Sequence, residues 1–191
     1  MKKFLLLIYI SMGSFSFLFG EDKVEGIHYR DSLQKVIELL PADSTRLSYL
    51  ERMAYCHQYP PLDKFFAASL WEESIRQENA YYENLGAYYM ATCFDKRHDP
   101  DSLSYWVDKL KEMALQRGTY DYYLEQKAAL SRAQASKRKV EKAIYTAKDV
   151  LEEAIRYRSH NGEIAAYNSL ACAYSAVSYT HLRAHETEAD L

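Results

Sequence analysis

The stretch YYENLGAYYMATCF, Tyr81–Phe94, decides the fold. Within it Tyr82, Gly86 and Tyr89 are spaced four and then three residues apart, so they share one face of a helix. The small residue in the middle of that face lets a neighbouring helix approach closely, while the rings fill the space on either side. The stretch therefore predicts a helix that packs tightly against another helix.

The same order of large, small and third residue recurs three times, in Leu50-Ala54-His57, Leu124-Ala128-Ser131 and Tyr167-Ala171-Tyr174. The four small residues are 32, 42 and 43 positions apart. Four occurrences predict helical hairpins that stack, because each hairpin buries its apolar face only against its neighbours. The residues expected to pack the repeats together are Leu50, Ala54, Tyr82, Leu85, Gly86, Tyr89, Leu124, Ala128, Tyr167, Leu170, Ala171 and Tyr174.

The composition and the positions of the residues that begin and end helices agree with an all-helical chain. Glycine (6) and proline (4) are scarce among the 191 residues, and the stretches between them are rich in helix-forming residues. Asp99-Pro100 is expected to open a helix over residues 101–117, Gly118 to end it, and Thr119 to cap the next. Pro60-Pro61 and Asn161-Gly162 are expected to separate further helices.

Tyr82, Leu85, Gly86 and Tyr89 resemble the W-x2-L-G-x2-Y signature of tetratricopeptide repeats (TPR), and YNSLACAY at 167–174 is similar. The spacings of 42 and 43 exceed the family's period of about 34. The resemblance implies a TPR-like α-solenoid of antiparallel helical hairpins over residues 43–176, with about 3.5 hairpins.

The first twenty residues have the pattern of a secretory signal peptide. Lys2-Lys3 precede an apolar run that ends at Gly20, and charge begins at Glu21. Cleavage after Gly20 and export to the periplasm are expected; the alternative is an uncleaved anchor. Residues 21–42 are expected to form a lead-in helix. The segments 31–33 (DSL) and 40–47 (LPADSTRL) resemble the lead-in of exported TPR regions.

The last fifteen residues have a different origin in our interpretation. VSYTHLRAHET, Val177–Thr187, is identical to one reading frame of a transposon-end adapter used in sequencing libraries. Residues 177–191 are therefore expected to be a non-native tail, and the native chain to continue differently after Ala176. His181 and His185 have the spacing of zinc ligands on a helix. The adapter resemblance implies that they are not part of the native chain, so no native zinc site is expected there. A last helix without a partner is expected to promote self-association.

No catalytic, cofactor-binding or metal-binding motif is recognisable, so no enzymatic activity is expected. The net charge of −3 argues against a nucleic-acid partner. The densest basic run, residues 137–139, is followed by Glu141 and is expected to be a solvated helix face. The adjacent acids at 72–73 and 152–153 are expected on solvent faces, and His57 in the core. The three cysteines, which match no metal pattern, are expected to be small buried residues: Cys56, Cys93 and Cys172.

In a TPR array the first helix of each hairpin lines a groove, so the resemblance assigns groove positions relative to each small residue. These positions are Glu51, Tyr55, Gln58, Glu83, Ala87, Met90, Glu125, Ala129, Arg132, Asn168 and Cys172. Three glutamates among them would repel a peptide carboxylate, so a neutral or basic peptide segment is the expected partner. The alternative is a solvated groove without a ligand.

The resemblance implies a non-catalytic interaction or sensor region, the extracytoplasmic part of a membrane-bound signalling protein with a histidine kinase or helix-turn-helix output. Two alternatives remain open: a free-standing periplasmic TPR adaptor, and the non-catalytic N-terminal region of an enzyme.

Overall fold

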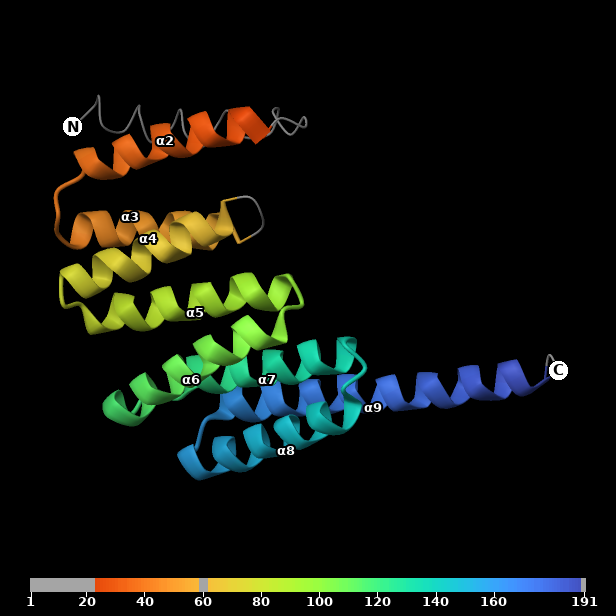
Figure 1. The fold of residues 1–191 in the computed structure, drawn as a ribbon. Helices are drawn as coiled ribbons and strands as arrows, with labels where there is room; N and C mark the ends of the chain where they lie inside the picture. Colours follow the sequence, from red (N-terminus) through yellow and green to blue (C-terminus); the bar gives the residue numbers. More distant parts are fainter. Residues whose placement is uncertain (1–22, 59–61, 190–191) are drawn as a thin grey trace. The chain divides into compact units, whose positions relative to one another are not determined.

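The computed structural model describes residues 23–58 and 62–189, and all regular elements in these ranges are α-helices (Figure 1). They are α2 (Lys23–Leu39), α3 (Ser44–Cys56), α4 (Asp63–Arg76), α5 (Ala80–Lys96), α6 (Pro100–Arg117), α7 (Asp121–Ser136), α8 (Val140–Tyr157) and α9 (His160–Ala189). The expected all-α class is confirmed. The expected signal peptide and the Pro60-Pro61 break lie outside the described residues.

The chain divides into two compact units, residues 1–38 and 39–191. Helix α2 belongs to the first unit apart from its last residue, and it covers most of the expected lead-in segment. Helices α3 to α9 belong to the second unit. The candidate site lies entirely in this second unit.

In the second unit consecutive helices pack against each other as antiparallel neighbours (Figure 1). Helices α3 and α5, α5 and α7, and α7 and α9 are also in contact. These alternate helices begin at residues 44, 80, 121 and 160, which are 36, 41 and 39 residues apart. We call α3, α5, α7 and α9 the first layer, and α4, α6 and α8 the second layer.

The helix ends around α6 follow the expected chemistry. The Asp99 side chain caps α6 by accepting a hydrogen bond of 3.2 Å from the Ser102 backbone N–H, and Pro100 is the first helical residue. Gly118 ends the helix in the left-handed conformation, with φ of 70°. The expected roles of Asp99, Pro100 and Gly118 are therefore confirmed.

The expected cap at Thr119 is wrong. Tyr120 stands at the cap position of α7 and makes no side-chain capping hydrogen bond. The Thr119 hydroxyl accepts a hydrogen bond of 3.1 Å from Asn84 Nδ2 on α5 instead. A tertiary partner has thus replaced the local one.

The expected turn at Asn161-Gly162 is also wrong, because both residues lie in the first turn of α9. The chain reverses earlier, at Arg158, whose φ of 55° is left-handed. Gly162 serves close packing: a Cβ there would lie 2.7 Å from Leu124 Cδ1 and 2.9 Å from Ser159 Oγ.

The small residues of the first three repeats are buried as expected. Ala54 is 2% exposed and Ala128 is fully buried. A Cβ on Gly86 would lie 2.8 Å from the Trp71 Cα atom, so α4 packs directly on the α5 backbone at that point. The YYENLGAYYMATCF stretch therefore forms the close helix contact that it predicts.

The packing assignment of the fourth repeat is wrong by several residues. Tyr167, Ala171 and Tyr174 are exposed. The buried residues of α9 are small ones at the same helical spacing: Gly162, Ala166, Ser169 and Ala173. Helix α9 carries two faces with this spacing, and the small-residue face is the one that α8 can approach. Ala166 is the seventh residue of α9, as Gly86 is of α5.

Candidate functional site

The first layer gathers tyrosines and glutamates on three neighbouring helices. We define the tyrosine–glutamate face by five residues: Glu51 and Tyr55 on α3, Tyr81 on α5, and Tyr122 and Glu125 on α7. These residues come together because α5 packs against both α3 and α7.

Tyr88 joins α5 to the α7 part of this face. Its ring centroid lies 4.9 Å from that of Tyr122, and its hydroxyl donates a hydrogen bond of 2.9 Å to Glu125 Oε1. The ring of Tyr88 also meets the buried Tyr89 edge-on at 5.6 Å. Tyr88 thus connects the α5 and α7 parts of the face through its contacts with Tyr122 and Glu125.

The outer rings remain open to solvent. Tyr55 is 67% exposed and Tyr81 is 58% exposed, while Tyr122 is half-buried. The ring of Tyr81 meets that of Tyr82 edge-on at 5.1 Å. The face therefore has accessible ring surface on both α3 and α5.

The charge of Glu51 acts across all three helices. Burial, and then the carboxylate of Glu51, raise the pKa of Tyr89 to about 12. Burial raises the pKa of Tyr122, and the negative charges of Glu51 and Glu125 raise it further. Both phenols consequently stay protonated near neutral pH.

Two of the three expected groove glutamates keep an uncompensated charge. Glu83 forms an ion pair with Arg117 at the end of α6. In residues 30–58 and 62–177, neither Glu51 nor Glu125 forms an ion pair. The tyrosine–glutamate face is therefore negative as well as aromatic.

The other expected groove residues do not all join this face. Ala87 and Ala129 are buried in the hydrophobic core, so they are not available to a ligand. Gln58 accepts a hydrogen bond from Lys96 Nζ, at 3.1 Å. Of the remaining positions, Met90 and Arg132 are partly buried. Asn168 and Cys172, both on α9, are exposed.

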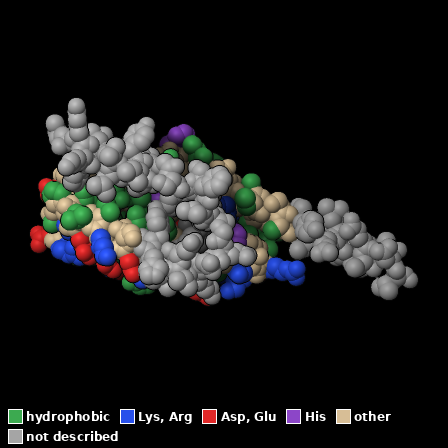
Figure 2. All heavy atoms as spheres, turned by 90° about the horizontal axis from the view of Figure 1, so that it is seen from above, with side chains coloured by type: hydrophobic (Ala, Val, Ile, Leu, Met, Phe, Trp, Pro, Cys, Tyr) green, Lys and Arg blue, Asp and Glu red, His purple; other side chains and the backbone are tan. Residues whose placement is uncertain are grey.

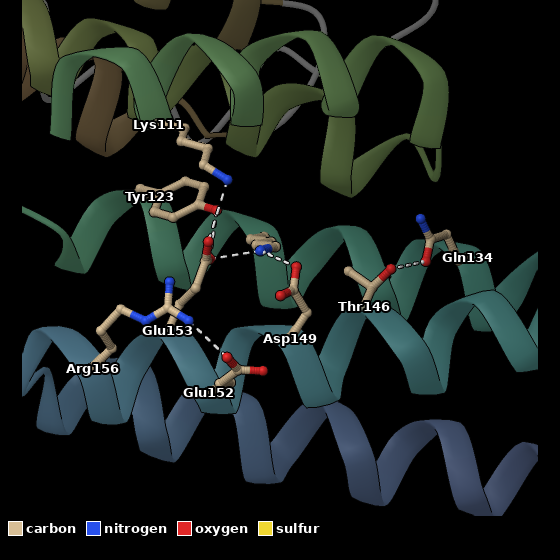
Figure 3. Close-up of polar contacts among 9 residues, drawn as sticks. Lys111, Tyr123, Gln134, Thr146, Asp149, Glu152, Glu153 and Arg156 are labelled. Carbon is tan, nitrogen blue, oxygen red and sulfur yellow. Dashed lines mark hydrogen bonds and ion pairs between the residues drawn. The ribbon is translucent and has the colours of Figure 1, made fainter. Parts of the chain in front are cut away.

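A buried polar network, unexpected from the sequence, lies between α6, α7 and α8 (Figure 3). Glu153 is 7% exposed and accepts hydrogen bonds of 2.6 Å from both the Tyr123 hydroxyl and Lys127 Nζ. Lys111 Nζ adds a contact of 3.3 Å to Glu153, and Lys127 also pairs with Asp149. The network joins three helices through one carboxylate.

The expectation that adjacent acids lie on solvent faces is therefore wrong for Glu153, and also for Glu73. Glu73 is 4% exposed and pairs with Arg46 and Arg76. The first acid of each pair, Glu72 or Glu152, is exposed, and Glu152 forms an ion pair with Arg156.

The available signal for burial of Glu153 was its position three residues after Val150, on the apolar face of the helix. The expectation gave more weight to its charge than to that position.

Burial alone would raise the pKa of Glu153, but hydrogen bonds from Lys127 and Tyr123 outweigh it. The net effect, with the charges of Lys127 and Lys111, is a pKa below the ordinary 4.5. Glu153 is therefore ionised near neutral pH, and all its described partners are donors. The network is a structural link rather than an acid–base pair.

The cysteines are free thiols with different surroundings. Cys93 is buried as expected, and burial raises the pKa of its thiol to about 12. Cys56 and Cys172 are exposed, so the expectation that all three are buried is wrong. His57, expected in the core, is only partly buried, and its ring stacks on that of Phe66 at a centroid distance of 5.1 Å.

The surface shown in Figure 2 carries acidic and basic side chains beside each other along one edge. Among the described residues, no three histidine, cysteine or acidic side chains are placed to hold a metal ion. In the part of the chain that the structure describes, no helix combines the length and apolar character needed to cross a bilayer. His181 and His185 fall outside the described side chains. Comparison with protein-family models, curated proteins and solved structures gives no match.

Proposed function

We propose that this chain is a non-catalytic protein-interaction region, an α-solenoid of the TPR type whose first layer carries the binding surface. The tyrosine–glutamate face is the observation that carries the proposal. It presents exposed aromatic rings on α3 and α5, and on α3 and α7 it presents carboxylates that form no ion pair among the described residues. Tyrosine is enriched in protein interfaces because a ring supplies contact area at low cost in conformational entropy.

The cellular setting that we propose is the extracytoplasmic side of a membrane, as the sensor part of a larger signalling protein. The support is the sequence of residues 1–20 and the resemblance of segments 31–33 and 40–47 to exported TPR regions. The adapter resemblance of 177–191 makes the gene beyond codon 176 the place to look for the output module. Sequencing the genomic locus without transposon adapters distinguishes a membrane-bound signalling protein from a free-standing adaptor.

Site-specific photo-crosslinking tests the interaction surface. A photoreactive phenylalanine analogue replaces Tyr81 on the face or, as the matched control, Tyr105 on α6, which is 63% exposed. In cells that contain the native partner, we expect a discrete crosslinked product from position 81 and none from position 105. Equal yields from both positions, or none from either, would overturn the proposal.

A further inference from the structure

We propose that the tyrosine–glutamate face binds a peptide partner through a cationic side chain, arginine or lysine, held over the exposed tyrosine rings. This inference rests on the proposed function and adds the chemistry of the partner. It follows from the rings, from the carboxylates and from the engaged cations at the ends of α5 and α6.

The rings offer the first half of a cation site. Tyr55 and Tyr81 expose more than half of their surface, and Tyr122 is half-buried beside them. The face of an aromatic ring attracts a cation, more often arginine than lysine, with about 0.5–2 kcal/mol depending on desolvation. Rings on α3, α5 and α7 offer more such surface than one ring alone.

The carboxylates offer the second half. Glu51 and Glu125 lie on the two helices that flank α5, and Tyr122 experiences the charge of both. The Tyr88 hydroxyl fixes Glu125 through Oε1, and among the described residues Oε2 accepts no hydrogen bond. A guanidinium or ammonium group would supply the missing donor and the missing positive charge.

The cations at the ends of α5 and α6 are already engaged. Arg117 binds the Glu83 carboxylate and the Ala80 carbonyl, and Lys96 binds the Gln58 side chain. The negative charge of the face makes a cation its complementary occupant. An anionic segment would be repelled, and a neutral segment would leave both carboxylates of the face uncompensated.

Panning a phage-displayed library of random peptides, about twelve residues long, on the immobilised chain tests the inference. The test variant is Glu51→Gln with Glu125→Gln, in which the amide oxygen introduced at position 125 can still accept the Tyr88 hydrogen bond. The control is Glu112→Gln with Glu152→Gln, which removes the same charge from exposed positions on α6 and α8. Circular dichroism verifies that both variants fold.

We expect the enriched peptides to contain arginine or lysine. Replacing that residue by norleucine in a fluorescein-labelled copy should weaken binding at least about tenfold by fluorescence anisotropy, as should the test variant. The control variant should change the Kd by less than about twofold, and added salt should weaken binding.

Two other outcomes separate this inference from the proposed function. Enriched peptides without a cationic residue, or peptides that bind the test variant equally well, overturn the cation site and leave the interaction surface in place. A library from which no peptide is enriched overturns both.

Discussion

At the scale of single residues, buried charge is where the structure departs most from the sequence pattern. Lys127 and Glu153 are each less than one-tenth exposed, and each is paired. Charged residues are almost never this buried unless paired, so the position of Glu153 on the apolar face indicates burial only when its partner is known. Lys127, the buried partner of Glu153, lies on another helix, 26 residues earlier in the sequence.

Glu153→Gln should destabilise the fold by about 2–4 kcal/mol, because it leaves Lys127 with only Asp149 to compensate its charge. Urea unfolding followed by circular dichroism measures the loss. The neighbouring Glu152→Gln removes an exposed pair with Arg156 and should change stability by less than about 1 kcal/mol. Equal losses in the two variants would contradict the account of the network.

The same carboxylate makes a prediction about acid. The folded pKa of Glu153 is below the unfolded value of about 4.5, so its stabilisation is present above that pH. It is lost as the pH falls through the lower, folded pKa. The wild-type urea midpoint should therefore fall more steeply than that of Glu153→Gln as the pH decreases from about 6 to 3. If the urea midpoints of the two proteins fall equally steeply with pH, this prediction is contradicted.

At the scale of helices, local chemistry predicts the ends of α6, because helix caps depend on residues near in sequence. The close contact at Gly86 is a packing contact with α4, and the small residue between large ones predicts it. The face of α9 was not predictable in the same way. Its two candidate faces have equal spacing, and contact with α7 and α8 decides between them. The groove assignments share this limitation, since Ala87 and Ala129 are buried by tertiary packing.

Gly86→Ala should destabilise the fold by about 1–3 kcal/mol, although alanine favours a helix by about 1 kcal/mol over glycine. The added Cβ would lie within 2.9 Å of two Trp71 backbone atoms, so α4 must move away. Urea unfolding provides the measurement. A Gly86→Ala protein that is more stable than wild type would show that this close contact is not formed.

At the scale of the molecule, α9 leaves exposed apolar surface on its outer face, including Tyr167 at 59% and Ile164 at 49% exposure. We expect concentration-dependent self-association through this helix, measured by sedimentation velocity. Tyr167→Glu should shift the distribution toward monomer. Tyr145→Glu, at a 74% exposed position on α8, should behave like wild type. A monomeric wild type at all concentrations would refute the expectation.

The central claim is that the tyrosine–glutamate face on α3, α5 and α7 is the binding surface, and NMR tests it most directly. Backbone amide shifts of the 15N-labelled chain are recorded while an arginine-containing peptide enriched by panning is added. We predict perturbations concentrated around Glu51, Tyr55, Tyr81, Tyr122 and Glu125 on α3, α5 and α7. Perturbations concentrated on α6 and α8, or along the exposed face of α9, would contradict the account.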